Sequence, residues 1–330
     1  MPLFSIIIPV YNRPEELQEL FESIDKQSFR DFEVVVVEDG SVKKSDQLVN
    51  AYTEKFSTQY LYQENKGPGL ARNNGAGCAS GRWLLFLDSD CLLPEDYLAL
   101  VAEEVASEDF DCFGGPDKAH PSFNTIQKAI GYAMSSVLTT GGIRGAREKL
   151  DVFYPRSYNL AVRNSVFHSL GGFSNMRFGE DLDFSMRLLE KGYSTRLIKP
   201  AFVYHKRRNN FRSFFKQIYN SGIARINLDL RHPGTLKPVH WLPALFVMGH
   251  LALLLLAFVN PACLLLLLVV PLIVFSHARY ETGNGKTALW AVPAALTQTF
   301  AYGLGFLEAF ITRKIMGRKE FQAFSKNFYK

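Results

Sequence analysis

The fold is decided by Arg82-Trp83-Leu84-Leu85-Phe86-Leu87-Asp88-Ser89-Asp90, an apolar run that ends abruptly in two carboxylates. A run of this length, bounded by Gly81 and Pro94, is typical of a strand buried on both faces of a parallel sheet. In open α/β sheets, ligands bind beyond the carboxyl ends of the strands, where Asp88 and Asp90 would lie. Because neighbouring carboxylates repel each other, the pattern favours a divalent cation or a cluster of donors there, with a solvated loop as the alternative.

Other apolar runs alternate with helical patterns on both sides of this segment. Further strands are expected at Ser5–Val10, Phe32–Val37, Gln59–Gln63, Phe110–Gly115, Ser157–Val162, Tyr193–Ile198 and Ala201–Tyr204. Helices are expected at Pro14–Ile24, Ser45–Phe56, Glu95–Ala106 and Glu180–Lys191. The first elements alternate β-α-β-α-β, and right-handed crossovers make such a series a doubly wound α/β sheet.

The N-termini of two expected helices carry residues that could bind a ligand or take part in catalysis. Asn65–Gly75 reads as a glycine-rich turn followed by a small-residue helix, and Lys66 and Arg72 make its N-terminus a candidate anion site, with a helix-packing turn as the alternative. Neither a dinucleotide fingerprint nor a P-loop is present. The later helix opens with Glu180 and Asp181, which also suit a helix dipole without any further role.

Composition divides the chain of 330 residues, which has a net charge of +5. Its four cysteines lack metal-binding spacing and fit reduced thiols on a cytosolic face, and no signal peptide is expected at the N-terminus. Val239–Phe275 is nearly free of charge and Ala288–Ile311 is mostly apolar. A soluble domain followed by a membrane segment is therefore expected.

The segment before the apolar region is basic and interleaved with aromatic residues. Its cations are Lys206, Arg207, Arg208, Arg212, Lys216, Arg225, Arg231 and Lys237. Directly before a membrane span, this pattern predicts an interfacial helix on an anionic leaflet, and the membrane segment argues against a nucleic-acid surface. By the positive-inside rule, the soluble domain would be cytoplasmic and the protein a multi-pass inner-membrane protein.

Five short motifs together resemble the family 2 glycosyltransferases, which have the GT-A fold. They are Ser5-Ile-Ile-Ile-Pro-Val-Tyr-Asn12, Val37-Glu-Asp-Gly-Ser41, Gly69-Leu-Ala-Arg-Asn-Asn-Gly75, Leu87-Asp-Ser-Asp90 and Gly179-Glu-Asp181. The resemblance covers residues 3 to about 210 and implies a doubly wound, mixed GT-A sheet followed by transmembrane helices. The expected domains are a GT-A catalytic domain at 1–204, a basic interfacial segment at 205–238, and a membrane domain at 239–330 with two or three hydrophobic helices.

The resemblance also implies roles for individual residues. The nucleotide pocket would be formed by Pro9, Tyr11, Asp39 and Arg72. The D-x-D motif, Asp88 and Asp90, would hold Mg²⁺ or Mn²⁺ together with the ribose and diphosphate of the donor, and His205 would join the metal ligands. The acceptor side would be formed by Gly171 and Gly172, and the E-D motif would supply Asp181 as catalytic base and Glu180 as a substrate-binding residue.

The expected activity is transfer of one sugar from a nucleotide-sugar, most simply a UDP-sugar, to a membrane-associated acceptor. A single ionised carboxylate suffices for displacement with inversion at the anomeric carbon. Processive relatives carry Gln-x-x-Arg-Trp, whereas Gln217 is followed here by Ile218-Tyr219-Asn220-Ser221, which favours one transfer per encounter. A polyprenyl-linked acceptor for cell-surface polysaccharide or glycolipid is expected. A polyprenyl-phosphate sugar synthase and a non-catalytic membrane scaffold are the alternatives.

The number of membrane spans is left open by conflicting signals. Val239–Val259 and Ala262–His277 read as a hairpin turned at Asn260-Pro261, and the length of Ala288–Ile311 favours a third span. The tail after it is basic, with Arg313, Lys314, Arg318, Lys319, Lys326 and Lys330. Basic residues favour the cytoplasmic side, so a re-entrant or surface-lying third segment is the alternative.

Overall fold

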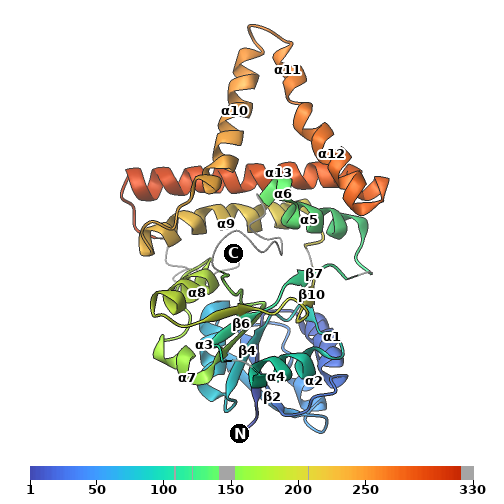
Figure 1. Ribbon diagram of the computed structural model, residues 1–330, viewed down its shortest axis with the longest axis vertical. Helices are drawn as coiled ribbons and strands as arrows, with labels where there is room; N and C mark the ends of the chain where they lie inside the picture. The colour runs from blue at the N-terminus through green and yellow to red at the C-terminus, as the bar shows by residue number, and fades with distance from the viewer. Residues whose placement is uncertain (108, 121, 141–152, 207, 321–330) are drawn as a thin grey trace. The chain divides into compact units, whose positions relative to one another are not determined.

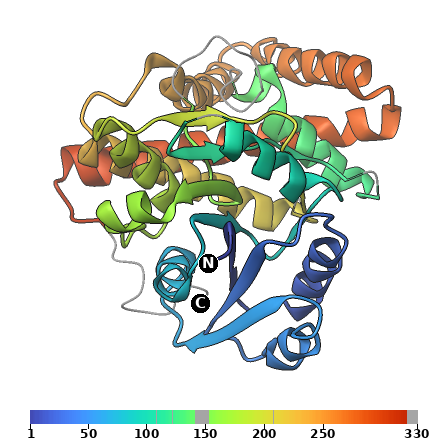
Figure 2. The ribbon, with the colours of Figure 1, turned by 60° about the horizontal axis from the view of Figure 1, so that its bottom comes forward.

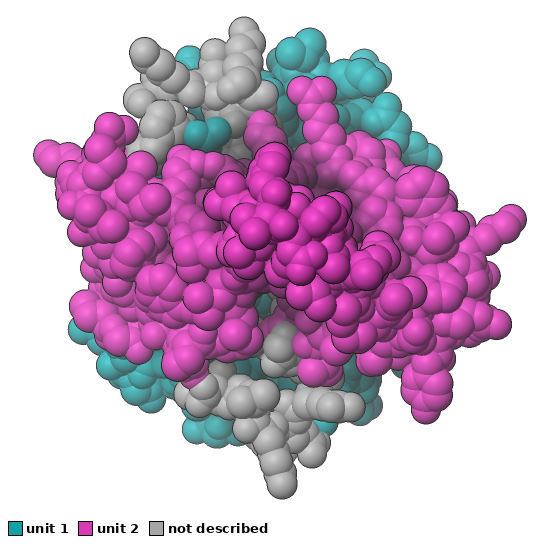
Figure 3. Space-filling model, turned by 90° about the horizontal axis from the view of Figure 1, so that it is seen from above, with its two compact units in different colours: residues 1–118, 151–205, 321–330 teal, residues 119–150, 206–320 magenta. Residues whose placement is uncertain are grey.

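A computed structural model (Figure 1) describes residues 1–107, 109–120, 122–140, 153–206 and 208–320. The chain divides into two compact units, coloured separately in Figure 3. The first, here called the sheet unit, takes in Met1–Lys118 and Asp151–His205. The second, the helical unit, takes in Ala119–Leu150 and Lys206–Glu320. The basic end of the C-terminal tail, with Lys326 and Lys330, lies outside the described residues.

The sheet unit is built on a seven-stranded sheet with the order β3-β2-β1-β4-β8-β6-β9. Its strands are β1 (Phe4–Val10), β2 (Phe32–Asp39), β3 (Ser57–Gln63), β4 (Trp83–Leu87), β6 (Cys112–Gly114), β8 (Asn159–Arg163) and β9 (Thr195–Leu197). The strands β1 to β4 run parallel, whereas β8 is antiparallel to both β4 and β6. This confirms the expected mixed α/β sheet, and β4 is buried along its whole length as its apolar run predicted.

Helices cover both faces of this sheet. One face packs against α1 (Pro14–Asp25), α2 (Asp46–Ala51) and α4 (Tyr97–Ser107), and the other against α3 (Pro68–Cys78), α7 (Asn164–Ser169) and α8 (Glu180–Glu190). Figure 2 shows α1 and α2 on one side of the blue strands and α3 on the other. The alternation of a strand explains both contacts: Ile6 and Ile8 enter the first core, and Ile7 enters the second.

A second, small sheet lies beside the end of β4. It has the order β5-β10-β7, with β5 (Cys91–Leu92), β7 (Asp117–Lys118) and β10 (Val203–His205). β10 pairs antiparallel with β5, so that His205 lies opposite Cys91. This pairing therefore brings His205 next to the residue that directly follows Asp90.

The helical unit contains the apolar C-terminal region. Its helices are α5 (Thr125–Ser135), α6 (Val137–Thr140), α9 (Phe211–Arg231), η1 (Pro238–Trp241), α10 (Leu242–Leu256), α11 (Cys263–Leu266), α12 (Val269–Thr282), α13 (Gly285–Ala309) and the π-helical turn η2 (Phe310–Ile315). In Figure 1, α10, α11 and α12 form a hairpin, and α13 runs across the base of that hairpin beside α9.

Two helical stretches in the described residues are long and apolar enough to cross a membrane, judged by length and composition alone. They are Pro238–Leu256 and Cys263–Thr282, with 19 and 20 residues and mean hydropathies of 1.9 and 2.0. They correspond to the two apolar segments of the expected hairpin. The third segment, for which a span was expected from its length, forms α13 and is not among them.

Candidate active site

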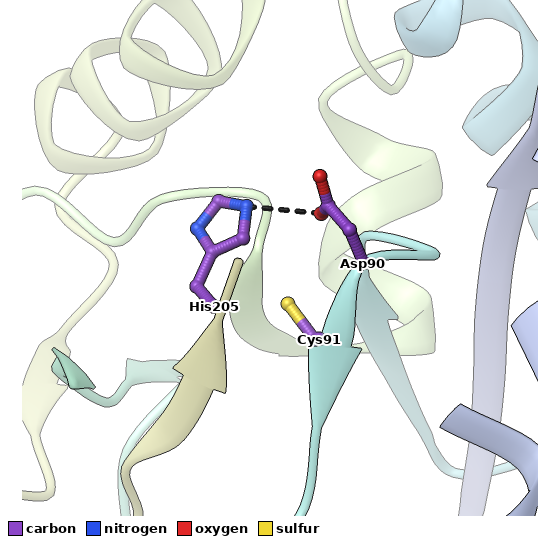
Figure 4. A group of neighbouring side chains, drawn as sticks. All are labelled: Asp90, Cys91 and His205. Atoms are coloured by element: carbon purple, nitrogen blue, oxygen red, sulfur yellow. Dashed lines mark ion pairs between the residues drawn. The ribbon is translucent and has the colours of Figure 1, made fainter. Parts of the chain in front are cut away.

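Two carboxylates and an imidazole meet beyond the end of β4. Nε2 of His205 lies 3.0 Å from Oδ1 of Asp90 and 3.8 Å from Oδ2 of Asp88. Figure 4 shows the His205 ring turned toward Asp90. Local sequence supplies the two aspartates, and the β10–β5 pairing supplies the histidine.

The orientation of His205 is set by residues on its other side. Nδ1 lies 4.0 Å from Oδ2 of Asp117, and the ring packs against Tyr158 with centroids 5.2 Å apart. The Asp117 carboxylate is therefore near Nδ1 but beyond hydrogen-bond distance, while Nε2 faces the two aspartates. Oxygen and imidazole ligands of this kind suit Mg²⁺ or Mn²⁺, so the residues present fit a divalent cation.

Cys91 lies in the same cluster but has another role in the structure. Its Sγ is within 4.8 Å of the ligand atoms of Asp90 and His205. Burial, followed by the charges of Asp88 and Asp90, raises the pKa of the Cys91 thiol well above its ordinary value. The thiol contacts the carbonyl oxygen of Tyr158 at 3.6 Å and belongs to the core below the sheet. A protonated thiol is a poor metal ligand, so Cys91 is best described as a packing residue.

Arginines already partly neutralise the acidic pair. Nη1 of Arg13 lies 2.7 Å from Oδ2 of Asp90. Arg72, buried on α3, reaches Oδ1 of Asp88 at 2.6 Å and Oε1 of Glu180 at 3.2 Å. A buried guanidinium requires such partners, and this one joins the end of β4 to the start of α8. Nε of Arg72 has no hydrogen-bond partner within the described ranges.

The two carboxylates at the start of α8 have different environments. Oδ2 of Asp181 accepts a hydrogen bond from Nε of Arg156 at 2.7 Å, and its Oδ1 accepts one from the backbone N–H of Leu182 at 2.8 Å. Burial alone would raise the pKa of Asp181, but the charge and hydrogen bond of Arg156 hold it below its ordinary value. Burial and the charge of Asp181 raise the pKa of Glu180 to about 7, although Arg72 opposes the shift. At neutral pH, Asp181 is therefore ionised while Glu180 is partly protonated.

Asp39 lies at the N-terminus of α3. Its carboxylate accepts hydrogen bonds from the backbone N–H groups of Lys66 and Gly67, both at 2.8 Å, and from Nε2 of Gln63 at 2.7 Å. The sequence predicted an anion at this helix start. In the structure, the anion that accepts from two N–H groups there is the Asp39 carboxylate of the chain itself. These hydrogen bonds hold the turn that precedes α3 and Arg72.

The other predicted residues lie in loops that border these groups. Pro9 is in register with Val37 near the end of β1, and Tyr11 follows that strand. Gly171 and Gly172 have φ values of +73° and +69° in the turn after α7. A Cβ on Gly172 would lie 2.6 Å from the side-chain oxygen of Asn73, so glycine permits a close approach to α3.

Contacts join most of the predicted residues into one network. Arg72 bridges Asp88 and Glu180, His205 contacts both aspartates of the motif, and Asp181 follows Glu180 directly. Sequence reasoning missed the two arginines that pair with Asp90 and Asp181. Arg13 had a usable signal, since it follows a strand at its carboxyl end. Arg156 had none, because its contact with Asp181 spans 25 residues and depends on the tertiary fold.

The chain is similar in sequence to known glycosyltransferases. Glycosyltransferase AglE of Haloferax volcanii is 26% identical over 261 residues, which cover 76% of this chain and 82% of that protein. An uncharacterised glycosyltransferase of Haemophilus influenzae is 29% identical over 213 residues, which cover 62% of this chain and 65% of that one. The likeness extends to the fold of a solved structure, the mannosyltransferase PcManGT from Pyrobaculum calidifontis in complex with GDP-Man and Mn²⁺. Its TM-score is 0.64 at 18% identity, over 90% of this chain and 87% of that one.

The family assignment rests on a sequence profile. The profile described as "Glycosyl transferase family 2" matches residues 5–171, roughly half of the chain. The matched range contains β2 to β4, all of β1 except Phe4, both aspartates after β4, and Arg72. The chain therefore belongs to glycosyl transferase family 2.

Proposed function

We propose that this glycosyltransferase moves one sugar from a nucleoside-diphosphate sugar to a lipid-linked acceptor, with inversion at the anomeric carbon. The observation that carries the proposal is the network at the end of β4. There, a cluster of ligands suited to a divalent cation is joined through buried Arg72 to the carboxylates at the start of α8.

The residues that would hold the cation are Asp88, Asp90 and His205. When bound, Mg²⁺ or Mn²⁺ would neutralise the charge that develops on the departing diphosphate. Arg72 would act on the same group, because its unpaired, buried Nε is a donor without an acceptor in the described chain. A phosphate oxygen is the kind of acceptor that a guanidinium prefers.

Asp181 is the proposed general base. The acceptor oxygen attacks the anomeric carbon and its proton passes to the Asp181 carboxylate, while the bond from that carbon to the diphosphate oxygen breaks. Arg156 keeps Asp181 ionised and so ready to take the proton. One base without a separate nucleophile supports a single displacement, which inverts the configuration.

The remaining predicted residues would form the two substrate pockets. Pro9 and Tyr11 border the donor side, and Asp39 shapes it by holding the turn before α3. Glu180 would bind substrate beside the base, and Gly171 and Gly172 would lie under the acceptor. The donor nucleotide is proposed to be UDP. Because PcManGT was solved with GDP-Man, GDP-mannose is the second donor to test.

Attachment to the inner membrane is proposed for the hairpin of α10 to α12. Its outer surface is rich in exposed leucines, including Leu251, Leu254, Leu265 and Leu272. In water, exposed apolar surface of this extent is unfavourable, whereas lipid would cover it. With the basic residues before the hairpin on the inner side, the sheet unit would be cytoplasmic and close to a polyprenyl-linked acceptor.

The test is a donor screen on the detergent-purified protein. UDP- and GDP-sugars are added with and without Mn²⁺, and thermal stabilisation and release of nucleoside diphosphate are measured. One donor should stabilise the protein only with the metal, and a polyprenyl-linked glycan should accelerate its consumption. Polyprenyl phosphate as the only effective acceptor would replace the proposal with a sugar-phosphate synthase. If the protein neither binds nor consumes any of these donors, the alternative of a non-catalytic membrane scaffold would replace the proposal.

A further inference from the structure

One face of α13 is shaped for close packing against α9. A Cβ on Gly305 would lie 2.1 Å from the backbone oxygen of Tyr219, and one on Gly222 would lie 2.3 Å from that of Tyr302. The contact continues from Phe211 stacked on Trp290, with centroids 5.9 Å apart, to an ion pair between Asp229 and Lys314. The two helices therefore lie side by side along nearly their whole length and run in the same direction.

The opposite face of α13 carries bulky apolar side chains at helical spacing. We call Leu289, Leu296, Phe300, Leu304, Leu307 and Ile311 the outer stripe. Leu289, Leu304 and Ile311 are 64%, 40% and 48% exposed, and the other three are partly buried. Steps of three, four and seven residues place all six on one side of a helix. Phe300 packs on Phe246 and Leu307 packs against the core around Phe306, whereas the exposed Leu289, Leu304 and Ile311 need a partner that water does not supply.

The contacts of α13 with the hairpin lie at the hairpin's base. On the α10 side, Pro243 meets Gly303, Phe246 packs on Phe300 with centroids 5.3 Å apart, and Trp241 packs on Phe306 at 4.9 Å. On the α12 side, Val274 and Ala278 share a core with the first turns of α13. A third spanning helix would pack lengthwise against its neighbours, whereas α13 crosses them at their ends (Figure 1).

We infer that α13 lies flat in the membrane interface, with the outer stripe against the acyl chains of the inner leaflet. This inference rests on the proposed hairpin anchor. The two helices that would enter the bilayer begin beside the outer stripe, so the same lipid would cover both the hairpin and the stripe. Arg318 and Lys319 follow, are exposed, and suit anionic headgroups, whereas Arg313 and Lys314 are held by Asn227 and Asp229 of α9. On the far side of α13, α9 exposes Arg212 and Lys216 to water.

The arrangement removes the conflict between the length of the third segment and the charge of the tail. Two crossings return the chain to the side on which it entered, and a flat α13 keeps it there. The basic residues after α13 then lie on the same side as the sheet unit, as the positive-inside rule requires. A helix of 25 residues is long enough to span, so its length alone does not decide the topology.

Single-cysteine reporters in the full chain test both statements separately. Cys78 and Cys263 are replaced by serine, and buried Cys91 and Cys112 are kept. Asn260→Cys reports the hairpin tip, Arg318→Cys reports the chain after α13, and a variant that retains Cys78 reports the sheet unit. With an impermeant reagent on intact cells, Asn260→Cys should be labelled, and the other two should be labelled only after permeabilisation.

The outcomes separate the two proposals. Labelling of Arg318→Cys from outside, with Cys78 protected, would mean that α13 crosses, and it would overturn the inference while leaving the hairpin anchor intact. Protection of Asn260→Cys together with labelling of Cys78 only after permeabilisation would refute the spanning hairpin, and with it the inference.

A second measurement identifies what covers the outer stripe. Nitroxide labels at Leu304→Cys and, as a matched control, at Arg212→Cys are compared in phosphatidylglycerol-containing vesicles. The label at 304 should be relaxed several-fold more by oxygen, which concentrates in lipid, than by a water-soluble nickel complex, and the label at 212 should show the reverse. Dipolar broadening between labels at 304, with protection from both reagents, would mean that a second copy of the chain covers the stripe and would overturn the inference.

Discussion

The end of β4 and the start of α8 each bring two carboxylates within two residues of each other, yet the structure treats them differently. At β4, Asp88 and Asp90 both face the same nitrogen of His205, with an arginine on each. At α8, Arg156 pairs with Asp181, and Glu180 is left with a raised pKa. Both carboxylates of the first pair therefore face the same neighbouring group, His205. In the second pair, Asp181 is ionised and Glu180 is partly protonated at neutral pH.

The difference shows that an acidic pair is not in itself a metal site. What separates the two pairs is the imidazole. At β4, both carboxylates face one nitrogen of His205, whereas at α8 Arg156 pairs with Asp181. The following substitutions test whether this distinction corresponds to two chemical roles.

The largest effect is expected for Asp90→Ala. If Asp90 holds the proposed cation that would neutralise the leaving group, its loss should remove several kcal/mol of charge stabilisation, on the order of 10³-fold in rate. Metal-dependent release of nucleoside diphosphate measures it. Asp109→Ala, at a residue whose side chain is 98% exposed, is the control and should keep the wild-type rate. Full activity of Asp90→Ala, or of the wild type in excess chelator, would remove the metal from the mechanism.

Asp181→Asn is expected to come next, because it keeps the shape and removes the base. The kcat should fall by a factor on the order of 10²–10⁴ with donor affinity nearly unchanged. Steady-state kinetics with saturating acceptor and donor titration by thermal shift separate the two quantities. Asp183→Asn, in the same helical turn, is the matched control. A wild-type rate in Asp181→Asn would mean that Glu180 or Asp183 is the base.

Arg156→Met should give a smaller loss that depends on pH. The base works when ionised, so activity falls as the pH drops through the pKa of Asp181. Arg156 lowers that pKa, and without it burial would raise the pKa. The acid limb of the kcat profile should therefore move to higher pH, with little change on the alkaline side. Arg163→Met, which breaks a surface pair, should leave the limb in place. An unmoved limb in Arg156→Met would mean that Arg156 does not tune the base.

Glu180→Gln should have the smallest effect, less than about tenfold on kcat, because Glu180 does not take the proton. Its folded pKa of about 7 lies above the ordinary value of 4.5. The unfolded chain therefore releases its proton first, and the wild type loses stability as the pH rises from about 4.5 to 7. Glutamine does not ionise, so the difference in free energy of unfolding should increase in favour of Glu180→Gln over this range. Urea denaturation at several pH values measures it, and a pH-independent difference would contradict the raised pKa.

Local sequence patterns predicted much of the sheet unit, but they predicted only part of the candidate active site. Apolar runs predicted β1 to β4 within a few residues, because buried parallel strands need continuous apolar sequence. The strands β5, β7 and β10 have two or three residues, too few to produce a period, and these strands place His205. Motif order singled out Asp88, Asp90 and Asp181. The partners Arg13 and Arg156 come from distant segments and required the fold.

The helical unit was harder to predict for a related reason. Apolar composition identified the hairpin and α13, but it carries no information about how a helix is oriented relative to its neighbours. The orientation of α13 depends on backbone contacts with α9 at Gly222 and Gly305, which a single sequence does not distinguish from ordinary membrane glycines. The sequence analysis did not predict α5, although Asn124 and Gln127 form a capping box at its start.

The division of the chain has a consequence for how such proteins can be recombined. His205, which ends β10, is also the last residue of the segment Asp151–His205 of the sheet unit, and the helical unit resumes at Lys206. The helical unit is discontinuous, since Ala119–Leu150 belongs to it as well. A single crossover after residue 205 would therefore combine α5 of one parent with α13 of the other, across a core that includes Ile130, Ala133 and Ala291. A crossover one residue earlier would exchange the histidine too. The helical unit can therefore be exchanged only as two matched fragments, and the second must begin directly after His205.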